Sequence, residues 1–489
     1  MPSLTERAAS ATWWSAVEIL TRYGVQFVVA IVLARLLDPA DFGLMAMLLV
    51  FTALAALLVD GGLGTALVQK QRTTADDETT VFLTSTGMAV LLAAALWVAA
   101  PAIASFYSRP PLTALMRLLL VVLPLGALAA VPNALLALRL DFRTRAGAEL
   151  AASVVSGGLV LFLAWHGAGV WSLVWQAVTG AGMRALLLWI LSGWYPRGRF
   201  DRLAFHRLFR FGGYMLLANA INTLSVRLQS LLIGRMFDAR ALGFYTLAQE
   251  TQQAPAQFMA SLLNRVGLPV FSTVTDQPDK LLGAMRLSLR VSLFVFVPSM
   301  IGIAAVADPL VAALYGERWA PAAPILGILA LSTVFWPLHV LNLAAISALG
   351  RSDLVFRLEV VKGLISIPLI VVASLFGVQA VAWAVLASSI LCVAINTHYS
   401  GRLIGYSMFA QLHDQAATFL LTLVSTAIAL AASRWTVNPF LALLSAVIFA
   451  AVAYFGIAKL AKVTAWRELM DLLKALRTNR IDRLTRDAA

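Results

Sequence analysis

Charged residues are scarce in this sequence. They make up 12% of the 489 residues, against about 25% in soluble proteins, whereas 61% are hydrophobic. Cysteine is almost absent, and the single Cys392 excludes an intrachain disulfide. Apolar runs recur from end to end, and each is long enough to cross a bilayer core of about 30 Å. We therefore predict an all-α protein that crosses a membrane many times.

The motifs of common enzymes are also missing. None of the six lysines is followed by Ser or Thr, which excludes a Walker A motif and a built-in ATPase. HExxH and GxSxG do not occur, and the five histidines lack the spacing of metal ligands. We therefore expect no catalytic residue, no metal and no organic cofactor, and we favour a transporter over an enzyme.

The apolar runs and the positive charges together predict a topology. We expect fourteen spans, at residues 13–37, 42–68, 79–103, 112–138, 146–166, 170–194, 211–237, 242–268, 283–307, 322–349, 354–376, 378–402, 416–432 and 440–460. With a cytoplasmic N-terminus, 26 lysines and arginines fall on the cytoplasmic side and seven on the other. Positive charge collects on the cytoplasmic side of membrane proteins, so both termini are predicted to be cytoplasmic.

One short stretch occurs twice. ARLLDPADFG at Ala34–Gly43 and GRMFDARALG at Gly234–Gly243 share Arg, Asp and Gly in register, and each lies between long apolar runs. Such a repeat indicates two related halves. Because six spans separate the copies, both point the same way. We therefore expect two six-helix lobes related by a pseudo-two-fold axis along the membrane normal, around a central cavity.

This repeat sets the predicted domain organisation. We expect an N-terminal lobe at 1–194, a basic amphipathic linker at 195–210, a C-terminal lobe at 211–402, two further spans within 403–463 and an amphipathic tail at 464–489. Basic amphipathic segments lie on anionic leaflets, so membrane lipids are expected partners. The net charge of +13 is then explained without nucleic acid.

Polar residues inside spans must be paired or face water, and here they form stripes on spans one, seven and eight. Arginine binds phosphate through two donors and stays protonated, so a cavity with these residues would suit an anion such as a phosphate or pyrophosphate. The predicted lining residues are Arg22, Arg227, Arg265, Arg184, Asn219, Asn222, Gln253 and Gln257.

Simpler roles stay open for several intramembrane charges. Glu359 and Lys362 are spaced to pair with each other, and we interpret them as a structural pair. Glu18 could neutralise Arg22 in the same way, and Asp60 could cap a helix end. Arg184 stands alone in its span, where it would either reach the interface or line the cavity.

The run from Arg22 to Gln71 resembles the opening of polysaccharide flippases of the Wzx type. These belong to the superfamily that also holds multidrug extruders of the MATE kind and lipid II flippases. The most specific piece is ARLLDPADFG followed by DGGLGTALVQK. The likeness extends over the whole chain in length, span count and two-lobe plan.

The resemblance implies a function. Such proteins move undecaprenyl-pyrophosphate-linked oligosaccharide across the bacterial inner membrane by alternating access, coupled to an H⁺ or Na⁺ gradient. In related lipid II flippases, basic residues of spans one and eight hold the pyrophosphate, and Arg22 and Arg265 occupy comparable places here. Glu18, Glu250 and Asp60 become candidates for ion coupling. A polysaccharide polymerase or export complex is a plausible partner.

Three alternatives remain. A multidrug or cation antiporter on the same fold would have a more acidic or aromatic cavity. A membrane-embedded glycan polymerase would need a large outer loop with catalytic arginines and histidines, whereas only seven basic residues fall on the outer side. In a purely structural scaffold, replacing Arg22 or Arg227 would cost only stability.

Overall fold

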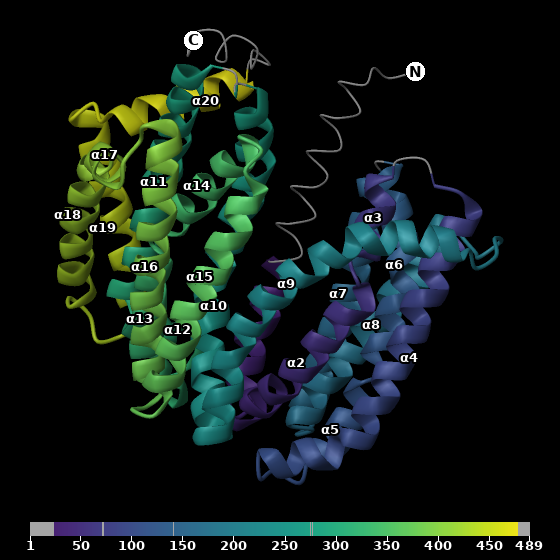
Figure 1. The fold of residues 1–489 in the computed structure, drawn as a ribbon. Coiled ribbons are helices and arrows are strands. Elements are labelled where there is room, and N and C mark those ends of the chain that lie inside the picture. The colour runs from purple at the N-terminus through teal and green to yellow at the C-terminus, as the bar shows by residue number, and fades with distance from the viewer. Residues whose placement is uncertain (1–23, 71–72, 140, 274, 276, 478–489) are drawn as a thin grey trace. The chain divides into compact units, whose positions relative to one another are not determined.

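The computed structural model describes residues 24–70, 73–139, 141–273, 275 and 277–477, and this part of the chain is helical, without strands (Figure 1). Ten of its helices are long and apolar enough to span a membrane. The prediction of an all-α, multi-pass membrane protein is therefore confirmed.

The chain forms two compact units, which meet in sequence between Thr246 and Leu247. The first unit contains a helix at Gly24–Leu36, α2 (Pro39–Asp60), α3 (Leu63–Gln69), α4 (Ala75–Phe106), α5 (Leu112–Leu119), α6 (Val122–Leu138), α7 (Phe142–Trp165), α8 (Val170–Ser192), α9 (Arg202–Met236) and the start of α10 (Ala239–Thr273).

The second unit begins within α10. It continues with α11 (Pro278–Ala305), α12 (Ala307–Tyr315), the short helix η1 (Glu317–Trp319), α13 (Ala322–Thr333), α14 (Trp336–Ala348), α15 (Ser352–Ser374), α16 (Val378–Ile404), α17 (Met408–Asp414), α18 (Ala416–Ser433), α19 (Pro439–Leu460) and α20 (Thr464–Arg477).

Four predicted spans fall outside the ten strongly apolar helices. They correspond to Gly24–Leu36, which is short in the described part, and to α9, α10 and α15. These are spans one, seven, eight and eleven, which hold most of the intramembrane polar residues noted in the sequence. Helices that bury such residues need neighbouring protein or water rather than lipid.

Helix starts follow local sequence rules. Asp38 caps α2 by accepting from the Ala40 N–H at 2.9 Å, and Pro39 occupies the first turn, where its missing N–H costs nothing. Thr74 forms a reciprocal capping box with Asp77 at the start of α4. Predicted span two breaks at Gly61 and Gly62, whose left-handed φ values of 53° and 70° suit glycine.

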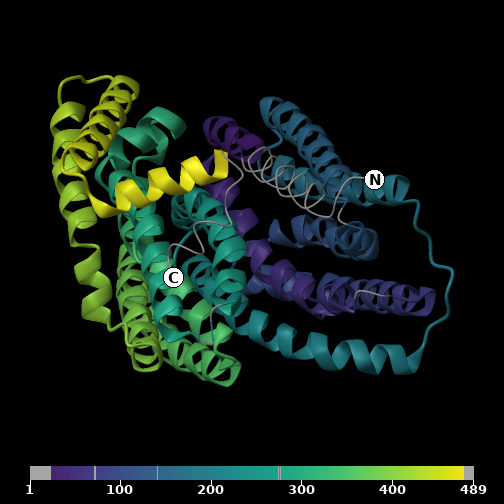
Figure 2. The same cartoon turned by 90° about the horizontal axis from the view of Figure 1, so that it is seen from above.

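The core of the second unit lies among α11, α14 and α16. The amphipathic α20 (yellow) lies across the ends of this unit's helices (Figure 2). Its Trp466 joins Phe294 and Tyr454 in an apolar cluster, and Glu468 accepts from Arg290 Nε at 3.0 Å. The apolar side of the tail is thus covered partly by this unit's own helices.

Candidate functional site

The two repeat copies meet in space, at the starts of α2 and α10. A Cβ atom added to Gly43 would lie 1.7 Å from the Ala239 carbonyl oxygen, and one added to Gly243 would lie 1.8 Å from the Pro39 carbonyl oxygen. The contact is reciprocal, because Pro39 and Ala239 occupy the same place in their copies. We call these four residues the seam. It leaves no room for a side chain at either glycine.

The shared aspartate also has the same role in each copy. Asp38 accepts from the Ala40 N–H at 2.9 Å, and Asp238 accepts from the Ala241 N–H at 2.6 Å. Asp38 additionally accepts from the Arg240 guanidinium at 2.8 Å. Two of the three identities in the repeat therefore have physical causes, one as a helix cap and one as a close backbone approach.

Removing the cap should lower stability modestly. Asp38→Ala is expected to cost about 1 kcal/mol of unfolding free energy, because an N–H at the start of α2 loses its acceptor. Arg240→Ala should change stability little, since an exposed ion pair contributes little. Thermal unfolding of the purified variants in detergent measures both, and an equal loss in the two would show that the ion pair, not the cap, matters.

The polar residues predicted to line span seven belong to α9, and some of them are buried or half-buried. Ser230 is buried and Arg227 is half-buried. The buried Gln229 Oε1 accepts from the Tyr245 hydroxyl at 2.6 Å, which fixes α9 against the start of α10. Asn219 and Asn222 belong to α9, but their side chains lie outside the described residues.

The glutamines of α10 lie beside its packing face. The buried side chains of Gln252, Ala256 and Met259 mark that face, and Gln252 Nε2 donates to Thr333 Oγ1. Gln253 is half-buried and Gln257 is exposed, as is Glu250. The side-chain amides of Gln253 and Gln257 are therefore not buried in the core of the second unit.

Thr251 and Tyr315 join α10 to α12. The two hydroxyls lie 2.8 Å apart. Burial raises the pKa of Tyr315 to about 12, so its hydroxyl stays protonated at physiological pH. The pair is a fixed polar contact rather than a titrating one.

Besides the side chains of Asn219 and Asn222, three further predicted residues cannot be placed. Glu18 and Arg22 lie outside the described residues, and so does the side chain of Arg265. Asp60 is exposed and its Oδ2 accepts from the Gly62 N–H at 3.3 Å, at the break between α2 and α3. This contact agrees with the role of Asp60 as a cap at a helix end, which we considered from the sequence.

Arg184, the one charged residue of its span, has a partner on another helix. Its Nε lies 3.2 Å from Glu149 Oε1, and the carboxylate is buried on the adjacent α7. Within-span spacing could not show this partner, because the two residues belong to different helices. Glu149 is the intramembrane acid that the sequence reasoning missed.

A second charged group lies among α14, α15 and α16. Lys362 Nζ donates to Glu359 Oε1 at 2.6 Å, and only 5% of the lysine side chain is exposed, against 43% of the glutamate side chain. On its other side, Nζ lies 3.5 Å from His339 Nε2. The buried Asn396 amide nitrogen lies 2.9 Å from His339 Nδ1. The expected pair is thus part of a four-residue cluster.

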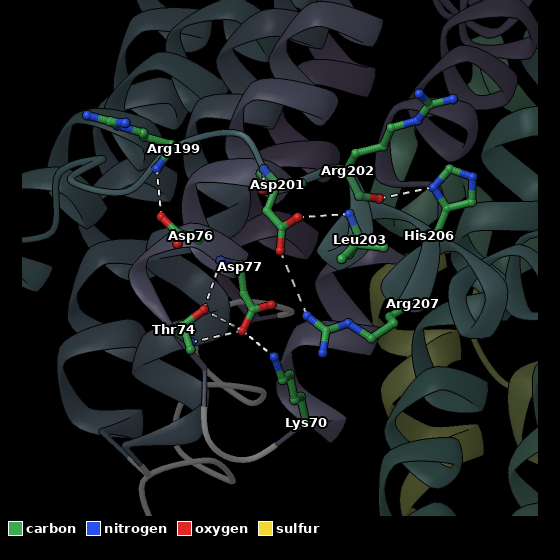
Figure 3. Close-up of polar contacts among 11 residues, drawn as sticks. Lys70, Thr74, Asp76, Asp77, Arg199, Asp201, Arg202, Leu203, His206 and Arg207 are labelled. Atoms are coloured by element: carbon green, nitrogen blue, oxygen red, sulfur yellow. Dashed lines mark hydrogen bonds and ion pairs between the residues drawn. The ribbon is translucent and has the colours of Figure 1, made fainter.

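The linker between α8 and α9 is held by the start of α4 (Figure 3). The Gly198 N–H donates to Thr79 Oγ1 at 3.0 Å, the Arg199 N–H to Asp76 Oδ1 at 2.7 Å and the Asp201 N–H to Thr80 Oγ1 at 2.9 Å. Linker backbone donors thereby meet acidic and hydroxyl side chains at a helix N-terminus. We call this set of contacts the clasp.

Beside the clasp, a hollow of about 380 Å³ carries mixed charge. Its lining includes Gln69, Lys70, Asp77 and Arg207. Lys70 is bonded to the buried Asp77, and Arg207 lies 3.9 Å from Asp201 (Figure 3). Because each base already faces an acid, the hollow has less free positive charge than its arginine and lysine suggest. Within the described part of the chain, no cluster of His, Cys, Asp or Glu could hold a metal.

Known proteins resemble this chain over most of its length. A family model described as "Polysaccharide biosynthesis protein" matches residues 32–324. "Teichuronic acid biosynthesis protein TuaB" of Bacillus subtilis (strain 168) is 26% identical, over 89% of this chain and 91% of that protein. "Lipopolysaccharide biosynthesis protein WzxC" of Escherichia coli (strain K12) is 27% identical, over 81% of this chain and 80% of that protein.

Two solved structures share the fold. The "Lipid II flippase MurJ, inward closed conformation" aligns with a TM-score of 0.75 at 15% identity, over 94% of this chain and 99% of that one. An inward-facing MATE family multidrug resistance transporter aligns with a TM-score of 0.60 at 15% identity, over 81% and 98% of the two chains. At this identity, the likenesses establish the fold alone.

Proposed function

Because the chain belongs to the polysaccharide biosynthesis protein family, whose model covers residues 32–324, we propose that it flips a lipid-linked oligosaccharide across a bacterial inner membrane. The family membership confirms the resemblance drawn from Arg22–Gln71. The cargo would be an undecaprenyl-pyrophosphate-linked repeat unit on its way to an exopolysaccharide or lipopolysaccharide. The protein would act as a transporter without catalytic residues, with both termini in the cytoplasm.

The observation that carries this proposal is a family match over residues 32–324 together with a fold likeness over 94% of the chain. "Succinoglycan biosynthesis transport protein ExoT" of Rhizobium meliloti (strain 1021) is 26% identical over 78% of each chain, and its name states transport. The fold of a lipid II flippase covers 94% of this chain. No large extramembrane segment separates the described helices, so a transporter fits better than an enzyme with a catalytic outer domain.

Physical chemistry explains the need for a protein. Each sugar hydroxyl left unpaired in hydrocarbon costs several kcal/mol, so an oligosaccharide cannot cross unaided. A polar path must replace water for the head while the lipid tail stays in the bilayer. The half-buried guanidinium of Arg227 is suited to such a path. Arginine would bind the pyrophosphate through charge-assisted hydrogen bonds.

The test is the orientation of the glycolipid in cells. Deleting the protein should leave complete lipid-linked repeat units facing the cytoplasm, and wild type should restore their exposure. Arg227→Ala, at matched membrane abundance, should lower the exposed fraction at least tenfold, because one lost charged hydrogen-bonding group costs about 1.5–3 kcal/mol. Arg227→Lys keeps the charge but loses the two-donor geometry. Its exposed fraction of glycolipid should lie between those of wild type and Arg227→Ala.

Two outcomes would contradict the proposal. If repeat units reach the outer face in the deletion strain and only remain unpolymerised, a glycan polymerase becomes the better interpretation. If the deletion instead sensitises cells to cationic drugs and leaves glycolipid exposure unchanged, the antiporter alternative on the same fold is favoured. Loss of stability alone in Arg227→Ala, with normal exposure per folded molecule, would leave Arg227 a structural residue.

A further inference from the structure

The hollow beside the clasp lies at the ends of two helices that are apolar enough to span a membrane. Gln69 ends the first of these candidate spans (Pro39–Gln69), and Ala75 begins the second (Ala75–Phe106). The hollow has a volume of about 380 Å³, and its lining includes Gln69 and Lys70. A bilayer places its lipid head groups just beyond the hydrocarbon core that such helices cross. The hollow is therefore at a depth where a lipid head group can enter it.

A tryptophan marks the same depth. Trp194 lies edge-to-face against Phe82, with ring centroids 5.5 Å apart, and its Nε1 donates to Glu78 Oε2 at 2.7 Å. A tryptophan with a packed ring and a hydrogen-bonded N–H is typical of the membrane–water interface. Trp194 belongs to an apolar cluster with Ala66 and Leu208, which also line the hollow. One side of the hollow is therefore apolar.

The ammonium group in the wall of the hollow is held in place. Lys70 Nζ is bonded to Asp77, whose side chain is 1% exposed. Asp77 Oδ2 also accepts from the Thr74 N–H and from the Thr74 hydroxyl, each at 2.9 Å. An ammonium group has three donors, and the bond to Asp77 uses one of them. Lys70 therefore offers further donors to the hollow from a fixed position.

A second cation reaches the hollow from α9. The Arg207 side chain is 67% exposed, and its Nη2 lies 3.9 Å from Asp201 Oδ2, which is beyond hydrogen-bond distance. Lys70 and Arg207 point toward one another from the end of α3 and from α9 (Figure 3). Charged donors of this kind make strong hydrogen bonds to phosphate oxygens. A phosphate group placed between the two side chains would accept from both.

The aspartate beside Arg207 has one available oxygen. Asp201 Oδ1 accepts from the Leu203 N–H at 2.8 Å as the N-cap of α9, whereas Oδ2 makes no hydrogen bond among the described residues. The side chain is 38% exposed. Asp76 and Glu78, on the neighbouring start of α4, each already accept a hydrogen bond at 2.7 Å. Asp201 is therefore the carboxylate beside the hollow that can accept from a ligand.

The charges of this group balance. Lys70 and Arg207 carry two positive charges, and Asp77 and Asp201 carry two negative charges. A pyrophosphate would bring excess negative charge next to the two carboxylates, which repel it. A ligand with one phosphate and one ammonium group complements both signs at once. Phosphoethanolamine, the head group of phosphatidylethanolamine, has this pattern.

We propose that the hollow binds the phosphoethanolamine head group of a membrane phospholipid, with the phosphate between Lys70 and Arg207 and the ammonium group on Asp201. Asp77 is a positioning residue, because it holds the Lys70 ammonium group. The linker sequence alone favoured anionic lipids, whereas the paired charges favour a zwitterionic one. The bound head group would join α9 to the ends of α3 and α4, and so add to the contacts of the clasp. The site does not depend on what the protein transports.

Native mass spectrometry of the purified protein in detergent measures the site. Phosphatidylethanolamine, phosphatidylcholine and phosphatidylglycerol are added at equal concentrations, and the fraction of protein that retains each lipid is compared. Wild type should bind phosphatidylethanolamine about tenfold more tightly than the other two, the usual effect of one charged hydrogen bond. Choline has no N–H for Asp201, and the glycerol head group leaves the phosphate charge uncompensated.

Asp201→Asn gives the sharpest result. Asparagine caps helices as well as aspartate does, so α9 should begin at the same place while one negative charge is removed. The variant should lose the preference for phosphatidylethanolamine over phosphatidylcholine, and it should bind phosphatidylglycerol more tightly than wild type does. Thermal unfolding shows whether the variant is folded. An unchanged preference in the folded variant would overturn the proposal.

Arg207→Ala tests the phosphate contact. It should weaken phosphatidylethanolamine binding about tenfold, because a charged donor is lost. Arg202→Ala is the matched control, since Arg202 is an exposed arginine of the same helix that does not line the hollow. Lys70 is kept in every variant, because its removal would leave the buried Asp77 carboxylate unpaired. Equal weakening in Arg207→Ala and Arg202→Ala would show general attraction to a basic surface and would contradict the site.

Soluble phosphoethanolamine distinguishes a lipid from a free phosphate ester. At the concentration of the lipid it should not displace bound phosphatidylethanolamine, because anchoring in the micelle raises the effective concentration of the lipid head group. Displacement at that concentration would identify a free phosphate ester as the ligand and would overturn the assignment to a membrane lipid. A wild type that binds the three lipids equally would refute the site, whatever the cargo of the transporter.

Discussion

Gly43→Ala and Gly243→Ala are each expected to destabilise the protein by about 1–3 kcal/mol, the usual cost of forcing extra atoms into a packed interior. The added Cβ would lie 1.7 Å from the Ala239 carbonyl oxygen in the first variant and 1.8 Å from the Pro39 carbonyl oxygen in the second. In both cases the obstacle is backbone, which cannot rotate away. The starts of α2 and α10 must therefore move apart.

The double variant gives the sharper result. Because one separation of the two helix starts relieves both clashes, Gly43→Ala with Gly243→Ala should cost clearly less than the sum of the single changes. Thermal or denaturant unfolding in detergent measures the stabilities of wild type, the two single variants and the double variant. Gly126→Ala is the matched control, since nothing lies within 4 Å of a Cβ at this position in α6, and alanine is the better helix former. Additive single effects would show that the glycines act separately and would contradict the seam.

Gly198→Ala is expected to open the clasp. A Cβ at this position would lie 2.3 Å from the Ala75 carbonyl oxygen, so the linker would have to leave the start of α4. The three N–H bonds from the linker to Thr79, Asp76 and Thr80 would then be lost or lengthened. At roughly 1 kcal/mol per bond, local opening should become about a hundredfold more frequent.

Limited trypsin digestion measures this opening, because Arg197 and Arg199 flank the substituted position. Cleavage between α8 and α9 should accelerate about a hundredfold when it follows the open fraction. Thr79→Val removes one acceptor and should accelerate cleavage by less. Gly213→Ala is the control within α9, where only the Phe209 ring, at 3.8 Å, is near. Equal digestion of Gly198→Ala and wild type would show that the linker is held by other contacts.

The sequence predicted most of the fold because long apolar runs leave few alternatives. Lipid forces the backbone into helices, and the repeat indicated two related halves, although it did not show that its two copies are in contact. The break of span two at Gly61 and Gly62 was suggested only as a helix end near Asp60. The linker was expected to lie on lipid, and its sequence gave no sign that Gly198 packs against backbone at Ala75.

The site was harder to predict because several of its polar contacts join different helices. Spacing within one helix reveals a pair such as Glu359 and Lys362, but not a pair across helices such as Arg184 and Glu149. His339 and Asn396 were invisible for the same reason, because each joins the cluster from its own helix. The proposed pyrophosphate ligands Arg22, Arg265 and Arg227, and the coupling candidates Glu18, Glu250 and Asp60, stay predictions.

The reciprocity of the seam bears on how the chain arose. In a two-fold homodimer, residue i of one subunit meets residue j of the other, and j meets i in return. Gly43 with Ala239 and Gly243 with Pro39 follow that rule within one polypeptide. A half-length ancestor with one copy of the repeat could have made the same contact with a second molecule of itself. Gene fusion would then have turned an isologous interface into an internal one.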